Sequence, residues 1–411
     1  MNAPDKKSLS YAFSPNHNMT LGTDVPDMGS GPISTESVTS PEYYEQEREK
    51  IFKRSWLEVG RTEEIADEGD YFTRELKVLG TNVIVIRGRD GQIRAFHNMC
   101  THRGMALGTE ECGNERTLVC EFHGWAFGLD GKLQHVPAVE SFPGIDKSQL
   151  GLKALACDTW NGFIFIHWQP EPEQSLIDFL GPMAADMDGF PFDRCNHIAH
   201  YSSTVKANWK VCIDAFQEAY HATYLHRNAI PGAGDIELAL PSSVRFYGPH
   251  RSVSCWFKPD LAPTASEAIS YKYGPVGFSK PADDEVDLAG DAGLNPSNDE
   301  SWWFDINVFN PNFFCDLGGG WYFTYNFWPN AVNETVWNMN IYQLEAQTAG
   351  ERIVQEFTRV VLRDTVYEDM STMELSQKAF DSGIIKEQFL GDMEIAVRHQ
   401  YWVNDNLVKQ G

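Results

Sequence analysis

The pattern of apolar and polar residues first separates a β-rich part of the chain from a mixed part. From about residue 57 to residue 170, short runs rich in Val, Ile and Phe alternate with glycine turns. Residues 83–96, VIVIRGRDGQIRAF, are typical of a hairpin because Asp-Gly stands at the position of its turn, and residues 127–136 repeat the arrangement. We therefore predict a compact all-β domain over residues 57–170.

Two further segments precede this domain. Residues 1–40 are rich in Ser, Pro, Gly, Asn and Asp without periodicity, which predicts a tail or an arm. The following segment, SPEYYEQEREKIFKRSW, places Ser40 at the N-cap and Pro41 at the first helical position, and its acids precede its bases. This pattern predicts a leading helix over residues 41–56.

Beyond Pro170, helical and strand-like segments follow one another. Residues 208–226, NWKVCIDAFQEAYHATYLH, are typical of a helix, and the chain from about Glu351 onward is largely helical as well. Between them, the alternation of residue types predicts strands over 302–309, 319–328 and 335–346. We therefore predict an α+β fold, with a second domain over residues 171–411.

Length and charge narrow the possible classes of protein. At 411 residues, of which 42% are hydrophobic, the chain has enough material for two packed domains. The formal net charge of −25 argues against nucleic acid as a partner, because a phosphate backbone is met by Lys and Arg. The first ten residues contain no apolar h-region, and no apolar run approaches the length of a membrane span. We expect a cytoplasmic protein without a membrane partner.

The predicted β-domain contains two segments that combine cysteine with histidine, in the patterns Cys-x-His and Cys-x2-His. The four residues are Cys100, His102, Cys120 and His123. A structural zinc site usually pairs cysteines as C-x2-4-C, which Cys-x-His does not match, and buried core histidines and a disulfide are further interpretations. Two thiolates and two imidazoles on two β-loops fit a Rieske [2Fe–2S] centre better, because the thiolates bind one iron and the imidazoles bind the other.

A second candidate site lies in the predicted helix 208–226. Positions i, i+4 and i+7 share a helical face, so Asp214, Glu218 and His221 are predicted to line up. His226 follows His221 by five residues, so both can bind one metal only if the helix loosens or ends there. Two histidines and one carboxylate on one face of Fe(II) leave open positions for O2.

Together these motifs resemble the Rieske-type non-haem iron oxygenases, the aromatic-ring-hydroxylating dioxygenase family, in their large (alpha) oxygenase subunit. CTHRG and CEFHGWAFGLDGKL are similar to the two loops of that family's Rieske motif. DAFQEAYHATYLH is similar to its iron motif, D/E-x3-D-x2-H-x4-H, with Glu218 where most members have Asp. The resemblance covers about residues 45 to 400. It implies a Rieske [2Fe–2S] cluster, a mononuclear non-haem Fe(II), and a catalytic domain of the helix-grip (START-like) kind, with an antiparallel sheet flanked by helices.

The resemblance also implies ligands for the mononuclear iron. His221 and His226 would bind it together with one acid of the C-terminal segment, for which Asp364, Glu368 and Asp369 compete. Family members place this acid four residues before a Met-Glu pair that opens a helix. That spacing favours Asp369, with the adjacent Glu368 as the alternative.

Assembly and activity follow from the same resemblance. The family forms head-to-tail trimers, in which Glu218 would bridge His221 of one subunit and His123 of its neighbour; we take Glu218 and Asp214 as catalytic candidates. The chain would be a terminal oxygenase component, with or without a β subunit. Its electrons would come from NAD(P)H through a separate ferredoxin or reductase, since no GxGxxG follows a predicted strand. Dihydroxylation, hydroxylation and dealkylation all remain open.

The substrate is less constrained. The aromatic strands 302–309 and 319–328 favour a hydrophobic aromatic or polycyclic compound. The alternative is a quaternary amine such as choline or carnitine, because a bridging Glu resembles the subgroup that acts on such amines, and Trp and Tyr would then form a cation–π cage. A non-catalytic Rieske electron carrier would need only residues 57–170, and a zinc protein would be colourless.

Overall fold

The computed structural model describes residues 20–21, 25–229, 243–256, 265–273, 292–296, 298 and 302–410. The chain separates into two units. One is formed by residues 48–179, and the other by residues 1–47 together with residues 180–411. The sheets are almost entirely antiparallel, and most strands and helices occupy separate stretches of the chain. This arrangement confirms the predicted α+β class.

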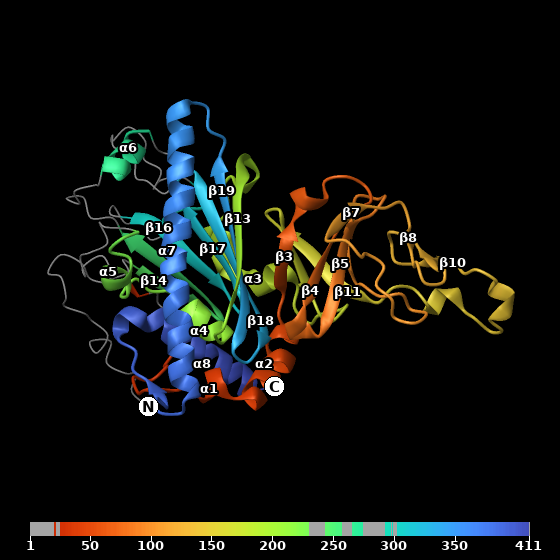
Figure 1. The fold of residues 1–411 in the computed structure, drawn as a ribbon, viewed down its shortest axis with the longest axis horizontal. Helices are drawn as coiled ribbons and strands as arrows, with labels where there is room; N and C mark the ends of the chain where they lie inside the picture. The colour runs from red at the N-terminus through yellow and green to blue at the C-terminus, as the bar shows by residue number, and fades with distance from the viewer. Residues whose placement is uncertain are drawn as a thin grey trace. The chain divides into compact units, whose positions relative to one another are not determined.

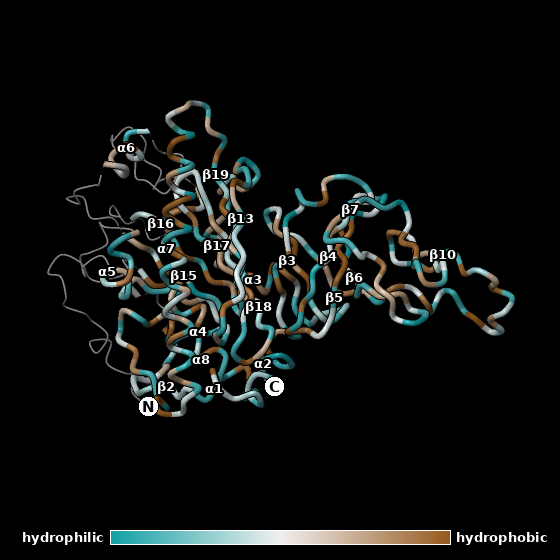
Figure 2. Tube along the Cα trace, viewed as in Figure 1, coloured by the Kyte–Doolittle hydropathy of each residue, from teal (hydrophilic) through white to brown (hydrophobic). Residues whose placement is uncertain are grey.

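The unit of residues 48–179 is built on antiparallel strands. A seven-stranded sheet has the order β3-β12-β11-β6-β5-β4-β7, and a three-stranded sheet has the order β10-β9-β8. Figure 2 shows hydrophobic stretches along β3, β4 and β5. The strands are β3 (Leu57–Arg61), β4 (Asp70–Leu76), β5 (Thr81–Arg87), β6 (Ile93–His97), β7 (Cys112–Asn114), β8 (Leu118–Val119), β9 (Ala126–Phe127), β10 (Leu133–His135), β11 (Ala154–Trp160) and β12 (Phe163–His167).

Both predicted hairpins are present in this unit. β5 pairs with β6 and β9 pairs with β10, each across a turn that contains Asp-Gly. Gly91 and Gly131 have φ values of +76° and +80°, which a residue with a Cβ rarely adopts. Ile84 and Ile86 on β5 are fully buried and belong to a core cluster that also contains Cys100 and Cys120. The hydrophobic core of the unit therefore fixes the two cysteines in place.

The leading helix is shorter than predicted. α2 spans Pro41–Lys50 rather than residues 41–56, and a 3-10 turn follows at Phe52–Arg54. Ile51 and Phe52, just beyond the end of the helix, are both fully buried. The other 3-10 turns of the unit are Thr62–Ile65, Lys77–Leu79, Val139–Ser141 and Lys147–Gln149.

The second unit is built on an eight-stranded sheet with the order β1-β14-β15-β16-β17-β18-β19-β13. Its neighbours are antiparallel except for β1 and β14. The predicted strands are confirmed within a few residues as β16, β18 and β19. The strands are β1 (Thr20–Leu21), β13 (Cys195–Val205), β14 (Ser243–Tyr247), β15 (His250–Trp256), β16 (Trp302–Phe309), β17 (Phe313–Gly318), β18 (Trp321–Ala331) and β19 (Glu334–Leu344).

Helices cover one face of this sheet. Figure 1 shows the long α7 running across the strands, and α4 contacts β18 and β19. No described helix combines the length and the apolar composition that a membrane crossing requires. The helices that carry residues of this unit include α3 (Leu176–Asp186), α4 (Trp209–Asp214), α5 (Ala222–Leu225), α6 (Ala265–Tyr273), α7 (Ala349–Asp381) and α8 (Ile395–Gln410). Short 3-10 turns lie at Phe192–Arg194 and Asp392–Glu394.

Part of the predicted tail is folded. β2 (Ile33–Ser34) pairs with β20 (Glu387–Gln388), and α1 spans Glu36–Thr39. Val38 is fully buried, and its carbonyl accepts a hydrogen bond of 3.0 Å from the side chain of Gln377. The local composition did not predict these elements because they form through contacts with residues far away in the sequence. Residues 1–19 and 22–24 of the predicted tail lie outside the described part of the chain.

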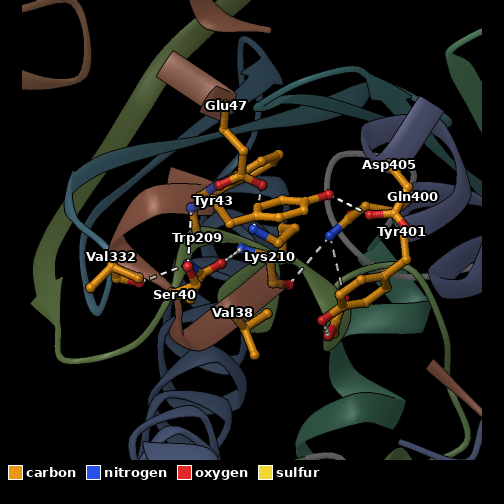
Figure 3. Close-up of polar contacts among 12 residues, drawn as sticks. Val38, Ser40, Tyr43, Glu47, Trp209, Lys210, Val332, Gln400, Tyr401 and Asp405 are labelled. Atoms are coloured by element: carbon orange, nitrogen blue, oxygen red, sulfur yellow. Dashed lines mark hydrogen bonds and ion pairs between the residues drawn. The ribbon is translucent and has the colours of Figure 1, made fainter. Parts of the chain in front are cut away.

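A buried ion pair within the second unit joins α2, whose residues 41–47 belong to that unit, to α4. Figure 3 shows Glu47 receiving hydrogen bonds from Lys210 Nζ at 2.5 Å and from Trp209 Nε1 at 3.0 Å. Both charged side chains are fully buried. Tyr43 donates to Asp405 on α8, so α2 is held against both α4 and α8. Paired in this way, neither charge is left alone in the interior.

Candidate metal centres

The two loops that carry the Cys-His motifs have the same backbone geometry. In each, the cysteine amide donates to the carbonyl five residues ahead, at 2.7 Å for Cys100 and 2.8 Å for Cys120. Each cysteine carbonyl accepts from a glycine amide four residues ahead, at 2.9 Å from Gly104 and 2.8 Å from Gly124. Both glycines have positive φ, +82° and +69°, which a side chain would disfavour. The glycine after each histidine therefore closes a loop of fixed shape.

Sulfur and imidazole groups converge between these loops. Cys100 and Cys120 are each 2% exposed, and burial raises the pKa of the Cys100 thiol. The rings of His102 and His123 lie 4.7 Å apart, and His102 also stacks on Trp125 at 4.7 Å. Nδ1 of His102 is buried and has no hydrogen-bond partner among the described residues. Such a nitrogen is satisfied if it binds a metal, so the four side chains fit a [2Fe–2S] cluster with two thiolate and two imidazole ligands.

The second candidate site does not lie on one continuous helix, and the prediction for residues 208–226 is wrong in this respect. α4 ends at Asp214, and α5 begins only after His221. The Glu218 side chain accepts hydrogen bonds from the backbone amides of Tyr220 and His221, the latter at 3.3 Å. Side chains that bond to the backbone in this way compete with helical hydrogen bonds. Asp214, Glu218 and His221 therefore do not share a helical face.

The break brings three possible metal ligands together. His221 and His226 stand at the two ends of α5, and their Nε2 atoms are 3.0 Å apart. Oδ1 of Asp369, on α7, lies 3.4 Å from His221 Nε2 and 3.2 Å from His226 Nε2. Ligands at right angles about 2.1 Å from one ion are about 3 Å apart, so one metal fits among them. Asp369 is 2% exposed and its Oδ1 accepts no hydrogen bond from the described residues, which also fits a cation site.

Each histidine turns its other nitrogen to a second carboxylate. Nδ1 of His221 lies 2.5 Å from Glu218 Oε1, and Nδ1 of His226 lies 3.0 Å from Glu368 Oε2. Acceptors of this kind fix the tautomer and orient the ring of a metal-binding histidine. The two adjacent acids considered as iron ligands thus have different positions. Asp369 faces the Nε2 atoms of both histidines, whereas Glu368 contacts the Nδ1 atom of His226. The sequence carried no signal for the contact of Glu368 with His226.

The expectation that a helix opens after Asp369 is also wrong. α7 is continuous over 33 residues, Ala349–Asp381, and Asp369 lies inside it. A capping box in which Thr348 and Glu351 satisfy each other's backbone amides marks the true start of the helix, twenty residues earlier in the chain. A position inside a long, packed helix holds the carboxylate more rigidly than a helix end would.

Asp214 has a different environment from the one predicted. It accepts hydrogen bonds from Tyr401 Oη at 2.8 Å and from Gln400 Nε2 at 3.4 Å, and burial raises its pKa to about 8. It contacts neither histidine through a hydrogen bond, but it lines an open pocket of about 430 Å³ together with Glu218 and His221. Asp214 is therefore placed beside the bridge candidate and forms no hydrogen bond with the proposed metal ligands.

The fold and the two sites define a class of protein: an iron–sulfur β-domain joined to an α+β domain with a two-histidine, one-carboxylate centre. Comparison with known families agrees. Residues 55–153 match the Rieske [2Fe-2S] domain, and residues 192–409, more than half of the chain, match the family described as the ring hydroxylating alpha subunit (catalytic domain). The chain belongs to this family of Rieske non-haem iron oxygenase subunits, whose cofactors are a Rieske [2Fe–2S] cluster and a mononuclear iron.

Two of the proteins with similar sequences are named as oxygenase subunits of monooxygenases for carnitine and for glycine betaine. The chain is 32% identical over 203 residues to the carnitine monooxygenase oxygenase subunit of Escherichia coli K12, covering 48% of this chain and 51% of that protein. It is 37% identical over 186 residues to the glycine betaine monooxygenase oxygenase subunit of Pseudomonas aeruginosa UCBPP-PA14, covering 44% of this chain and 42% of that protein. The chain thus spans about half the length of the curated relatives it matches.

Solved structures share the fold over nearly the whole chain. A quaternary ammonium Rieske monooxygenase studied for carnitine oxidation superposes with a TM-score of 0.72 at 22% identity, covering 92% of this chain and 94% of that one. Naphthalene 1,2-dioxygenase from Rhodococcus sp., bound to indole, superposes with a TM-score of 0.71 at 20% identity, covering 92% and 94%. Enzymes named for a quaternary ammonium compound and for an aromatic hydrocarbon share this fold, so the fold leaves the substrate open.

Proposed function

We propose that this chain is the terminal oxygenase component of a multicomponent Rieske oxygenase that oxidises a quaternary amine. It would use O2 and electrons from NAD(P)H, delivered by a separate ferredoxin or reductase. The observation that carries the oxygenase activity is the convergence of His221 Nε2, His226 Nε2 and Asp369 Oδ1 within 3.4 Å of one another. A protein that only carries electrons would not need this second metal centre.

In this proposal the residues of the two sites have separate roles. Cys100 and Cys120 bind one iron of the cluster, and His102 and His123 bind the other. His221, His226 and Asp369 bind the mononuclear iron, whose open coordination positions supply the chemistry of O2 activation when it is bound. Glu218 and Glu368 accept hydrogen bonds from the two histidines and hold their Nε2 atoms toward Asp369.

The substrate class rests on the sequence relatives. The proteins similar to this chain at 32% and 37% identity are named for carnitine and glycine betaine. They support the quaternary amine, which was the alternative from the sequence, over a hydrophobic aromatic or polycyclic compound. Monooxygenation would follow, because both relatives are named as monooxygenases, whereas a dioxygenase reaction in aromatic catabolism has no such support.

We further propose a homotrimer in which Glu218 bridges His221 to His123 of the neighbouring subunit. Two observations support this arrangement. Glu218 lines an open pocket together with the apolar side chains of Phe380 and Leu390. On the cluster loop, the ring of His123 lies 3.8 Å from that of Phe122, which is 52% exposed and so is available for a contact.

The test is O2 consumption by the purified protein with a suitable reductase. We expect a red-brown protein that consumes O2 and forms product with carnitine, glycine betaine or choline, and does neither with naphthalene. The variant His226→Ala, with its cluster spectrum intact, serves as the control for uncoupled reduction of O2. Turnover of naphthalene without turnover of any quaternary amine would overturn the substrate class, and a colourless protein would overturn the Rieske centre.

A further inference from the structure

A buried carboxyl group on β17 has no charged partner among the described residues. Asp316 is 5% exposed, and its Oδ1 accepts no hydrogen bond from any described residue. No described Lys, Arg or His forms an ion pair with it, and burial raises the pKa of its carboxyl group well above the ordinary range. Burying an ionisable group in this way costs free energy, and groups of this kind occur preferentially at functional sites.

The register of the sheet shows which way Asp316 points. It lies opposite Ile306 on β16 and opposite Phe323 on β18. Side chains alternate between the two faces of a strand, so Tyr325 is on the same face as Phe323. The Tyr325 ring packs 5.0 Å from Phe216, which lies two residues beyond the end of α4, so this is the face that the helices cover.

The helix-covered face of the sheet is also the face on the side of the proposed iron ligand Asp369. The carboxylates of Asp316 and Asp369 both raise the pKa of Tyr325, after the larger effect of its burial. In the register, Tyr325 lies two residues along β18 from Phe323, the partner of Asp316, and α7, which carries Asp369, is one of the helices over the sheet. Asp316 therefore belongs to the interior that the sheet shares with Asp369.

Aromatic rings surround this part of the sheet face. Trp321 stacks on Phe323 with 4.3 Å between ring centroids, and Phe304 lies 5.8 Å from Trp321. Gln343, opposite Trp321 on β19, is fully buried, and neither its amide oxygen nor its amide nitrogen has a hydrogen-bond partner among the described residues. Beside the aromatic rings, Oδ1 of Asp316 and the amide of Gln343 thus lack partners among the described residues that a bound molecule would supply.

The neighbouring acid Asp305 provides a comparison within the same sheet. It is on β16 and is as deeply buried as Asp316, with 2% exposure, but the alternation places it on the opposite face. It accepts a hydrogen bond from Ser254 at 2.5 Å and lies 3.5 Å from Arg245. Asp305 thus has a hydroxyl and a guanidinium partner, whereas Asp316 has a backbone hydrogen bond with Asn307 but no side-chain partner for its Oδ1 among the described residues.

We propose that Asp316 is the anionic group that recognises the cationic nitrogen of the substrate, with Phe304, Trp321 and Phe323 as its aromatic surroundings. Aromatic faces attract quaternary ammonium groups. A bound cation favours the ionised form of the Asp316 carboxyl group, which then adds a full negative charge that an aromatic cage alone lacks. This inference rests on the proposed function, because it specifies how a quaternary amine is selected over a neutral compound of the same shape. Asp316 is thus a specificity-determining residue.

The test compares pairs of compounds that differ in one charge. Choline is paired with 3,3-dimethylbutan-1-ol, and glycine betaine with 3,3-dimethylbutanoate, in each of which carbon replaces the charged nitrogen. Binding to the holoenzyme without O2 is measured by calorimetry, so that turnover does not enter. We expect the wild type to bind the cation of at least one pair more tightly, and Asp316→Asn to lose about tenfold or more of that preference.

Two controls separate this role from a structural one. Asp305→Asn removes a buried carboxyl group from the other face and should keep the preference for the cation. Asp316→Asn should unfold at a temperature no lower than the wild type, because it removes a buried ionisable group without a charged partner and keeps an oxygen that can accept from the Asn307 backbone. If Asp316→Asn retains the wild-type preference, the inference is wrong while the proposed function stands. If the wild type binds no quaternary amine, the proposed substrate class is wrong and the inference falls with it.

Discussion

The carboxylate of Glu368 lies 3.0 Å from Nδ1 of His226, on the opposite side of the ring from the nitrogen that faces Asp369. Two acids that are adjacent in the sequence therefore act on one imidazole from two sides. Asp369 is positioned to share a metal with His226, and Glu368 is positioned to orient it.

Replacement of these two acids should have different effects on iron content. We expect Asp369→Ala to lose the mononuclear iron, because it removes one of three converging ligand atoms. Glu368→Ala should retain iron at saturating concentration but bind it about 10- to 100-fold more weakly, because only the orientation of His226 is lost. Iron titration followed by metal analysis distinguishes the two. Loss of iron in Glu368→Ala with full retention in Asp369→Ala would reverse the assignment.

The two histidines should be separable from the iron–sulfur centre. His221→Ala and His226→Ala are expected to abolish turnover and lower mononuclear iron, since each removes a nitrogen of the 3.0 Å pair. The visible spectrum of the cluster should not change, because its four proposed ligands belong to the unit of residues 48–179. His200→Ala, at an exposed position on β13, is the control. A bleached cluster in either variant would contradict two independent sites.

Glu218→Gln tests the proposed bridge between subunits. We expect both metal centres and the proposed trimer to be retained at saturating iron, because Glu218 is not among the proposed ligands of either metal centre. Electron transfer should slow by orders of magnitude, since the side chain no longer holds His221 Nδ1 with a carboxylate. The measurement is a single turnover: the cluster is reduced chemically, substrate and O2 are added, and the Rieske absorption is followed. A rate equal to that of the wild type would show that electrons do not pass by this residue.

The buried pair of Glu47 and Lys210 should contribute strongly to stability. Lys210→Met leaves Glu47 without its counter-ion in the interior, and we expect the free energy of unfolding to fall by about 3–5 kcal/mol. The double variant Glu47→Gln, Lys210→Met should recover part of this loss. Lys206→Met, which removes the exposed partner of Glu334, should cost no more than about 1 kcal/mol. Denaturant titration measures all three, and equal losses for Lys206→Met and Lys210→Met would contradict the role of burial.

We expect the buried His399 to lower the free energy of unfolding in acid. It is fully buried on α8, and burial, helped by the charge of Arg251, lowers its pKa to about 3 from the ordinary 6.5. Below pH 6.5 the unfolded chain binds a proton that the folded chain does not, so stability falls as the pH drops from 6.5 toward 3, by up to about 1.4 kcal/mol per pH unit. His399→Gln should flatten this slope, and the exposed His200→Gln should not. An unchanged slope for His399→Gln would exclude His399 as its source.

The parts of the two sites that lie close together in the sequence could be predicted, and the parts that depend on distant contacts could not. The Cys100 and Cys120 loops were recognisable because each motif and its closing glycine occupy one short segment. The break after Asp214 was missed because Glu218 has a good helical propensity, and only its hydrogen bonds to the backbone show that it ends the helix. The pairing of Glu368 with His226 joins residues 142 positions apart, which no local pattern encodes.

The two roles of Glu218 have a consequence for variation at this position. One carboxylate oxygen receives backbone amides that shape the turn before α5, and the other receives His221 Nδ1. A shorter acid has to approach the ring by moving the turn, so Glu218→Asp would alter the main chain that carries His221 as well as the reach of the side chain. The length of the Glu218 side chain and the path of the main chain before α5 therefore depend on each other. A substitution at this position would be accommodated only together with changes in the residues between Ala215 and His221.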